Sequence, residues 1–396
     1  MNAPAAQELL DRQRRLWQAC QDALPGLDTV LVINKVNQYY LTGTMQDGLL
    51  VMRPDDLVRY FVRKSVTRAR EECPLDIVVP IGSYRDMLSD LAPDLGHAGL
   101  ELETMTLAAS ERIRKYFRIG QQSGIDRIIL DQRAVKSDTE LEIIAESGRQ
   151  HARLLGELVP GMLREGMSET DFLADLYAAM VKLGYQGVSR FAMPQMEMIV
   201  GQLGFGTNAI YPTNFNGPGG MRGMSPAVPI VGDRHRRLRR GDLVFVDVGY
   251  GVDGYHSDKT QVYCFGGEPS ERARSVHQAC RDVLAGLVGG IRPGAVPAQL
   301  YAKALRDLPE VLRDHFMGFP DDPVRFLGHG VGLQIDEMPV IAAGFDQPLE
   351  AGMVLALEPK CAVPGEGMVG VEETYLVTAA GCRCVTGGDQ PIRILA

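Results

Sequence analysis

The chain has 396 residues, of which 45% are hydrophobic and 23% charged, a composition typical of a globular protein rather than a fibre or a disordered chain. At this length we expect two domains, or one large domain with an appendage. The formal net charge of −9 disfavours nucleic acid and anionic membrane as main partners, because both require a basic surface.

The targeting features of the sequence favour a cytoplasmic protein. Residues 1–17 lack the apolar centre of a secretion signal, and no stretch of 18 uncharged apolar residues is present. The seven cysteines are an odd number without any Cys-x-x-Cys pair, which fits reduced intracellular thiols. We interpret the single basic run, residues 234–240, as a solvated loop that precedes a strand.

The first third of the chain alternates between helical and strand patterns. A helix is expected over residues 8–23, and apolar runs typical of strands follow at 29–33, 48–52, 58–62 and 76–80. This alternation predicts a small α/β domain that ends near residues 133–137. We therefore expect an N-terminal domain over residues 1–136 and a second domain over residues 137–396.

Two capping boxes predict where helices begin in the second domain. Ser137 and Glu140 form one box, and Ser168 and Asp171 open another helix that should run through Leu183. A third helix is expected over residues 270–288. Between residues 201 and 242 Gly, Pro, Asn and Met dominate, and we interpret this stretch, residues 201–235 above all, as a loop forming a wall or lid of a functional site, with disorder as the alternative.

Four strand-like runs after residue 241 contain most of the informative acidic residues. The runs are 243–248, 260–264, 354–357 and 369–377. Asp247 and Asp258 flank a turn at residues 250–254, so a hairpin would bring both carboxylates to one face. Glu358 ends the third run and Glu372 lies within the fourth.

A histidine adds to these acids in the stretch GHGVGLQIDE, residues 328–337, which is too rich in glycine for an ordinary amphipathic helix. Together with His329, the four carboxylates would form a pocket whose like charges raise one another's pKa values. Two divalent cations would neutralise them, and carboxylates with one imidazole suit Mn, Co, Fe or Zn.

The ordered set of motifs resembles the pita-bread family, which includes methionine aminopeptidase, aminopeptidase P, prolidase and creatinase. The motifs are Asp247-x-Gly, Gly254-Tyr-x-x-Asp258-x-Thr, Gly328-His329-Gly-Val-Gly, Glu358-Pro and Glu372-Glu-Thr. Residues 37–43 and 133–140 resemble the creatinase-type N-terminal domain and its junction, so the resemblance covers nearly the whole chain. It implies an α/β fold with a creatinase-type N-terminal domain and a C-terminal pita-bread catalytic domain.

The resemblance also implies a dinuclear centre. Asp247 would bind one metal through both oxygens, Asp258 and Glu372 would bridge, and His329 and Glu358 would hold the other metal. Water between the metals would be the nucleophile, with Glu358 as general base. A homodimer is implied as well, in which the partner's N-terminal domain lines the site.

The chain departs from the peptidases of this family at two histidines. No histidine stands between residues 201 and 234, where the first would lie, and His235 comes too late. Asp336 takes the place of the second, seven residues after His329. An ionised aspartate accepts hydrogen bonds but does not donate them to an oxyanion, so Asp336 would either anchor a cationic group or abstract a proton.

Three functions are therefore compatible with the sequence. The first is a metal-dependent hydrolase of the Xaa-Pro aminopeptidase or dipeptidase type, with a short peptide as substrate. The second is a hydrolase or lyase acting on a small cationic or zwitterionic compound, with Asp336 as base or cation anchor. The third is a binding protein without catalysis, which the complete set of five ligands disfavours.

Overall fold

The computed structural model describes residues 4–54, 57–192, 199–213, 215–319 and 322–396. The chain divides into two compact units, Met1–Arg133 and Ala134–Ala396. The domain limits expected from the sequence, after residue 136, stay a prediction. None of the helices in the described ranges combines the length and the apolar character needed to cross a membrane.

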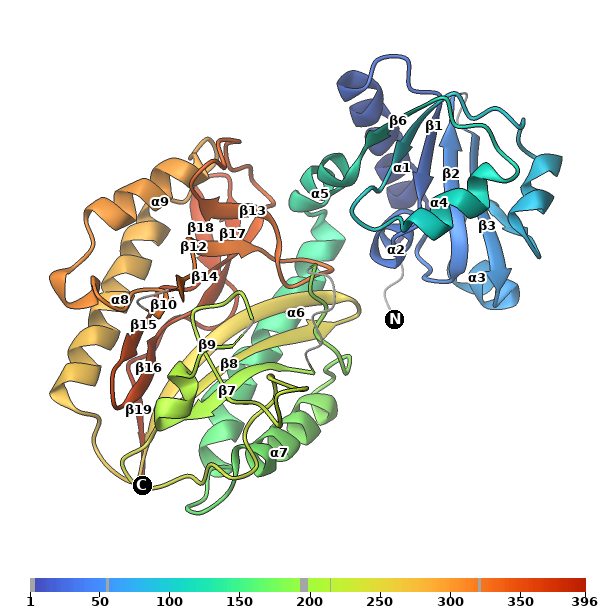
Figure 1. Cartoon of the computed structure of the whole chain (residues 1–396). Coiled ribbons are helices and arrows are strands. Elements are labelled where there is room, and N and C mark those ends of the chain that lie inside the picture. Colours follow the sequence, from blue (N-terminus) through green and yellow to red (C-terminus); the bar gives the residue numbers. More distant parts are fainter. Residues whose placement is uncertain (1–3, 55–56, 193–198, 214, 320–321) are drawn as a thin grey trace. The chain divides into compact units, whose positions relative to one another are not determined.

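The N-terminal unit is built on one mixed sheet of six strands in the order β4-β3-β2-β1-β5-β6. Its elements are α1 (Ala6–Ala23), β1 (Thr29–Val32), α2 (Lys35–Thr42), β2 (Asp47–Arg53), β3 (Leu57–Lys64), α3 (Val66–Glu72), β4 (Val78–Pro80), a 3₁₀ turn (Tyr84–Ser89), β5 (His97–Leu100), α4 (Leu107–Arg114), β6 (Gln121–Gly124) and α5 (Asp126–Ala134). Helices lie on both faces of the sheet, α1 on one and α4 on the other (Figure 1). The small α/β domain expected from the alternating pattern is confirmed.

The C-terminal unit contains two larger sheets, of five and four strands, and two short hairpins. Its helices are α6 (Asp138–Arg153), a π turn (Leu154–Leu158), α7 (Glu169–Lys182), α8 (Glu271–Gly290) and α9 (Pro297–Arg306), with 3₁₀ turns at Val159–Gly161, Gly206–Ile210 and Glu310–Leu312. Its strands are β7 (Gly201–Phe205), β8 (Leu243–Val252), β9 (Tyr255–Phe265), β10 (Gly318–Phe319), β11 (Asp322–Pro323), β12 (Phe326–Gly330), β13 (Glu337–Ala342), β14 (Val354–Leu357), β15 (Lys360–Val363), β16 (Gly367–Gly370), β17 (Glu373–Thr378), β18 (Gly381–Cys384) and β19 (Arg393–Leu395).

Each large sheet of this unit packs on its own helices. In the four-stranded sheet, β19-β9-β8-β7, the long β8–β9 hairpin is crossed by α6, with α7 nearby (Figure 1). In the five-stranded sheet, β13-β12-β14-β17-β18, apolar side chains of α8 such as Leu284 share a buried cluster with Leu355 and Tyr375. The mixed α/β fold expected from the sequence is therefore confirmed, and its two sheets enclose the predicted ligands.

Both helix starts predicted from capping boxes are confirmed. The Ser137 hydroxyl accepts a hydrogen bond from Glu140 N (3.3 Å), and the Glu140 carboxylate accepts one from Ser137 N (2.9 Å). Ser168 and Asp171 repeat this arrangement at the start of α7 (3.0 and 2.8 Å). Each box satisfies backbone N–H groups that a helix start leaves unpaired, so these starts are decided by local chemistry.

Two expectations about the second domain were wrong. Residues 201–205, expected to be loop, form β7, which pairs antiparallel with β8. The hydrogen bonds to β8 make this segment a strand, although its glycine-rich sequence lacks the alternation of apolar and polar residues that predicts one. The run 369–377 is not one strand but two, because the chain passes from the β15–β16 hairpin into the five-stranded sheet at Val371–Glu372.

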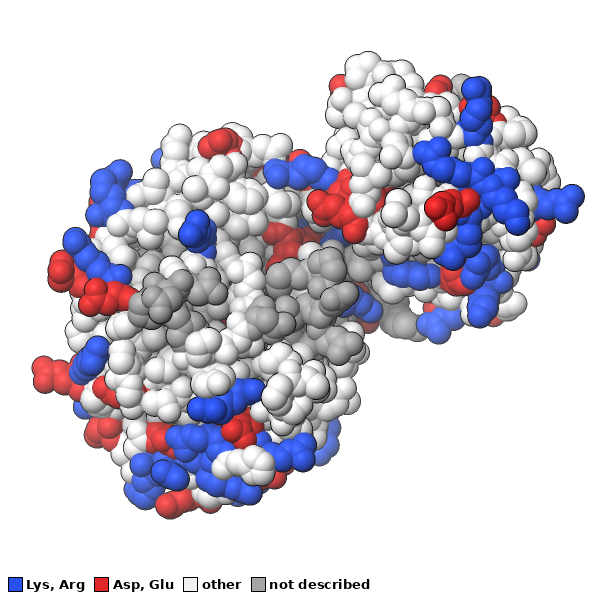
Figure 2. Space-filling model, viewed as in Figure 1, with Lys and Arg blue, Asp and Glu red and all other residues white. Residues whose placement is uncertain are grey.

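The basic run lies in an irregular segment directly before β8, as interpreted from the sequence. Arg236 pairs with Asp242 (2.6 Å) and Arg237 with Asp171 (3.4 Å), and His235 is exposed. Figure 2 shows lysine and arginine side chains interspersed with carboxylates at the end of this unit where the C-terminus lies. The positive charge is thus partly neutralised within the chain.

Candidate metal centre

The β8–β9 hairpin presents Asp247 and Asp258 on one face of its sheet. Asp247 pairs with Thr260 and Asp258 with Gly249, so the two carboxylates lie diagonally across the hairpin. Both side chains are buried. The hairpin and the shared face expected from the spacing of these residues are confirmed.

The other three predicted ligands come from the second sheet. His329 lies in β12, Glu358 directly follows β14, and Glu372 directly precedes β17. Antiparallel pairing of β14 with β12 and β17 brings these three positions together. Thr260 N donates to Glu372 O (3.2 Å), and this link fastens the second sheet to the β8–β9 hairpin.

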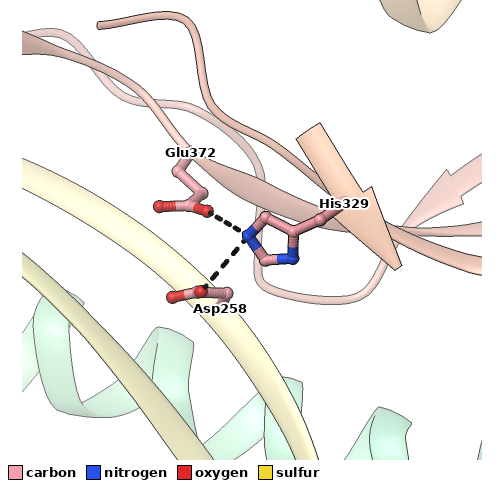
Figure 3. Close-up of side chains that lie close together, drawn as sticks. All are labelled: Asp258, His329 and Glu372. Atoms are coloured by element: carbon pink, nitrogen blue, oxygen red, sulfur yellow. Dashed lines mark ion pairs between the residues drawn. The ribbon is translucent and has the colours of Figure 1, made fainter. Parts of the chain in front are cut away.

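The imidazole of His329 faces three carboxylates. Its Nε2 lies 3.9 Å from Asp258 Oδ2, 3.6 Å from Glu358 Oε1 and 3.9 Å from Glu372 Oε1. Figure 3 shows Asp258, from β9, and Glu372, the residue before β17, converging on this nitrogen. One ligand atom from each of Asp258, His329 and Glu372 lies within 4.8 Å of the others, a spacing that suits a shared metal ion.

A fully buried lysine, which was not among the candidates from the sequence, occupies the other side of the cluster. Lys360 Nζ donates to Asp247 Oδ2 (2.8 Å), Glu358 Oε2 (2.9 Å) and Glu372 Oε2 (2.7 Å). Its position two residues after Glu358 was the available signal, because a lysine in such an apolar stretch requires carboxylate partners.

The electrostatics of the cluster reflect burial and mutual repulsion. Burial raises the pKa of Asp247 and outweighs the opposing effect of Lys360. Burial, then Glu372 and Asp247, raise the pKa of Asp258 well above its ordinary value. Burial lowers the pKa of Lys360, but Asp247, Glu358 and Glu372 together hold it well above its ordinary range, so its ammonium stays charged. Binding of a further positive charge would therefore stabilise the ionised carboxylates of the cluster.

The donor set fits a divalent transition-metal ion. Asp258, His329, Glu358 and Glu372 offer three carboxylates and an imidazole nitrogen, ligands that suit Mn, Co, Fe or Zn. Asp258 N donates to the Thr374 hydroxyl (2.8 Å), and the Thr260 hydroxyl donates to Glu372 Oε2 (3.0 Å). The contact of Thr260 with Glu372 is of the kind that orients a ligating carboxylate in a metal site, whereas the contact of Thr374 fixes the backbone of Asp258.

Asp336, the sixth residue singled out from the sequence, lies outside the cluster just described. Its Oδ1 accepts a hydrogen bond from Ala192 N (2.6 Å), which ties the β12–β13 connection to residues 189–192. Burial raises the pKa of Asp336, while Ala192 N and His329 oppose the rise. Because His329 acts on this carboxyl, Asp336 lies within electrostatic range of the cluster, and its role in the reaction stays a prediction.

The neighbour of Asp336 has a structural role that the sequence did not assign. The Glu337 carboxylate accepts from Gln334 N (2.8 Å) and pairs with buried Lys136 (3.5 Å). His256, which lies on β9 two residues before Asp258, is also buried and bonded to Gly332 O (3.0 Å). These contacts hold the turn between β12 and β13 beside the hairpin.

The irregular stretch after β7 is anchored by one buried acid. Glu169, the first residue of α7, accepts hydrogen bonds from Phe205 N (2.7 Å), Asp233 N (2.7 Å) and Asn208 Nδ2 (2.5 Å). Residues at both ends of the 205–233 segment thus converge on one carboxylate. Within this segment the Arg222 guanidinium lies 4.1 Å from the centre of the Tyr211 ring.

Taken together, the two-sheet fold and the acid-rich cluster with one histidine define the class of metal-dependent hydrolases. The chain belongs to metallopeptidase family M24, whose sequence pattern matches residues 142–379. The pattern of the creatinase/prolidase N-terminal domain matches residues 12–135. The creatinase-type N-terminal domain and the pita-bread catalytic domain implied by the resemblance are therefore confirmed.

Known relatives agree with this assignment. A Xaa-Pro dipeptidase of Pyrococcus furiosus is 25% identical over 371 residues, which cover 93% of this chain and 95% of that protein. A probable dipeptidase, PepE, of Mycobacterium tuberculosis is 35% identical over 260 residues, covering 64% of this chain and 58% of that protein. The crystal structure of dipeptidase PepE from Mycobacterium ulcerans has the same fold, with a TM-score of 0.79 at 23% identity and full coverage of both chains.

Proposed function

We propose that the chain is a metal-dependent peptidase of the Xaa-Pro dipeptidase type. The observation that carries the proposal is the convergence of Asp247, Asp258, His329, Glu358 and Glu372 on one buried cluster. The relatives that match nearly the whole chain, such as the Pyrococcus furiosus protein, are named for the same activity. We further propose manganese as the resident metal, from among the ions that these ligands suit, a cytoplasmic location and, as the family resemblance implies, a homodimer.

The residues of the cluster would have different roles in hydrolysis. Asp258, His329, Glu358 and Glu372 would hold a divalent ion, which when bound supplies Lewis acidity toward a carbonyl oxygen and a water molecule. Glu358 would take the proton of the attacking water on its carboxylate and return it to the leaving amine. The two sheets exclude bulk solvent from the cluster, since all four carboxylates are buried.

A second candidate is a hydrolase or lyase for a small cationic or zwitterionic compound. It is favoured by Asp336, which stands where the peptidases of the family place a histidine. A half-buried carboxyl at that position would bind an ammonium, amidinium or sulfonium group, or would abstract a proton.

One assay separates the two candidates. The purified chain, loaded anaerobically with Mn²⁺, is offered Xaa-Pro dipeptides and tripeptides beside a panel of betaine-like, sulfonium and amidine compounds. The peptidase proposal expects hydrolysis of the dipeptides that disappears in the Glu358→Gln variant. Turnover of the cationic compounds without any cleavage of peptides would refute it and favour the second candidate. A chain that binds no transition metal would be a binding protein instead.

A further inference from the structure

We propose that the ammonium of Lys360 replaces one of the two metal ions expected from the sequence, so that the centre binds a single divalent ion beside a built-in cation. The inference rests on the metal-dependent function proposed above and specifies how that centre is composed.

Glu358 and Glu372 each divide their two oxygens between two cation positions. Their Oε1 atoms face His329 Nε2, at 3.6 and 3.9 Å, whereas their Oε2 atoms bind Lys360 Nζ, at 2.9 and 2.7 Å. Asp258 completes the first position and Asp247 the second (3.9 and 2.8 Å). Two carboxylates that are shared in this way could bridge a pair of metal ions. Here one of the two cations is the ammonium of Lys360.

The oxygens of the second position are already engaged. Glu372 Oε2 accepts hydrogen bonds from both Lys360 Nζ and the Thr260 hydroxyl (2.7 and 3.0 Å). A divalent ion at this place would need the same three oxygens that bind the ammonium. An ion beside the ammonium would also be repelled by it, because two like charges would then lie close together in the buried cluster.

The backbone around Lys360 leaves the lysine little freedom to withdraw. The side chain is fully buried, and its Nζ lies 5.9 Å from the centre of the Phe245 ring. Lys360 pairs with Gly370 in the β15–β16 hairpin, and its carbonyl accepts a hydrogen bond from Met317 N (2.8 Å). Displacing the ammonium from its carboxylates would leave a buried charge without compensation, which is strongly unfavourable.

The direct test is the metal stoichiometry of the full-length protein. The chain is saturated with Mn²⁺ under anaerobic conditions, dialysed and measured by elemental analysis and by electron paramagnetic resonance. The proposal expects one ion per chain and the six-line spectrum of isolated Mn²⁺. Two ions per chain with a magnetically coupled spectrum would overturn it while leaving the proposed function intact. No bound ion at all would overturn both.

Substitution of Lys360 provides a second test of the metal stoichiometry. Lys360→Ala removes the ammonium and opens its place, so the variant should bind two ions. Lys136, another buried lysine paired with a glutamate of the same unit, is the matched control, and Lys136→Ala should still bind one. A Lys360→Ala protein that is folded and still binds only one ion would refute the proposal. If that variant does not fold, the stoichiometry of the unaltered chain decides.

Two ligand variants locate the single ion. His329→Ala should weaken Mn²⁺ binding by at least about tenfold, because the imidazole belongs to the proposed ion position. Asp247→Asn should change the affinity by less than about threefold, since that carboxylate contacts the lysine instead. The reverse order of effects would place the ion on the lysine side and overturn the inference.

Discussion

Glu169 provides a sharp test of the electrostatics of the catalytic unit. Its carboxylate is buried at the start of α7 and accepts three hydrogen bonds from the 205–233 segment. Burial raises its pKa from 4.5 to about 7, although the bonds from Phe205, Asp233 and Asn208 oppose the rise. The folded protein therefore binds a proton in a pH range in which the unfolded chain has released it.

The sign and size of the effect follow from proton linkage. Below pH 4.5 both states are protonated and the contribution of Glu169 to stability is fully present. Between pH 4.5 and about 7 that contribution is lost, because only the unfolded chain gives up the proton freely. At about 1.4 kcal/mol for each tenfold change in proton affinity, the loss is roughly 3 kcal/mol.

The assay compares the chain with its Glu169→Gln variant. Urea unfolding, followed by far-ultraviolet circular dichroism in the presence of chelator, is measured at pH values from 4.5 to 7.5. The free energy of unfolding of the unaltered chain should fall by roughly 3 kcal/mol relative to the variant over this range. Exposed Glu165→Gln is the control. A difference that stays constant within about 0.5 kcal/mol would refute the reasoning.

Four further predictions concern the metal centre and the β15–β16 hairpin beside it. Glu358→Gln should lower kcat by roughly 10²–10⁴ at equal metal content, and a decrease of less than about tenfold would exclude Glu358 as the base. Asp336→Asn should reduce turnover much more than Mn²⁺ affinity, both measured on the same preparation; unchanged turnover would show that this carboxyl only holds Ala192. Chelation should abolish activity, and Mn²⁺ restored to about 100 times its Kd should stabilise the fold by about 2.7 kcal/mol, seen as a rise in Tm of several degrees. Gly370→Ala should cost about 2 kcal/mol or more in urea unfolding, because a Cβ there, at φ +133°, would lie 2.5 Å from Pro359 O and Lys360 Cα; unfolding unchanged from the native chain would contradict this.

Much of the fold was predictable because the signals are local. The capping boxes at Ser137 and Ser168 place helix starts through bonds within four residues. The apolar runs that predicted β8 and β14 are local signals as well, because each lies within the strand that it predicts. Prediction failed where an element depends on a distant partner: β7 is a strand because β8 pairs with it, and the run 369–377 divides because its halves join different sheets.

The candidate ligands were also found from the sequence, although through an ordered set of motifs rather than through any local rule. Asp247, Asp258, His329, Glu358 and Glu372 do converge. Asp336 was singled out by what it replaces, and its hydrogen bond to Ala192 was not foreseeable because no pattern relates positions that are 144 residues apart.

The sequence by itself thus determined most of the elements, the family that the chain resembles and which side chains carry charge. Only the tertiary structure decided which charges meet. Lys360 reaches Asp247 across 113 residues of chain because the β15–β16 hairpin packs against the β8–β9 hairpin. Coulomb energy depends on distance in space rather than along the chain. The contacts of Lys360 with the carboxylates therefore could not be predicted before the two sheets were placed together.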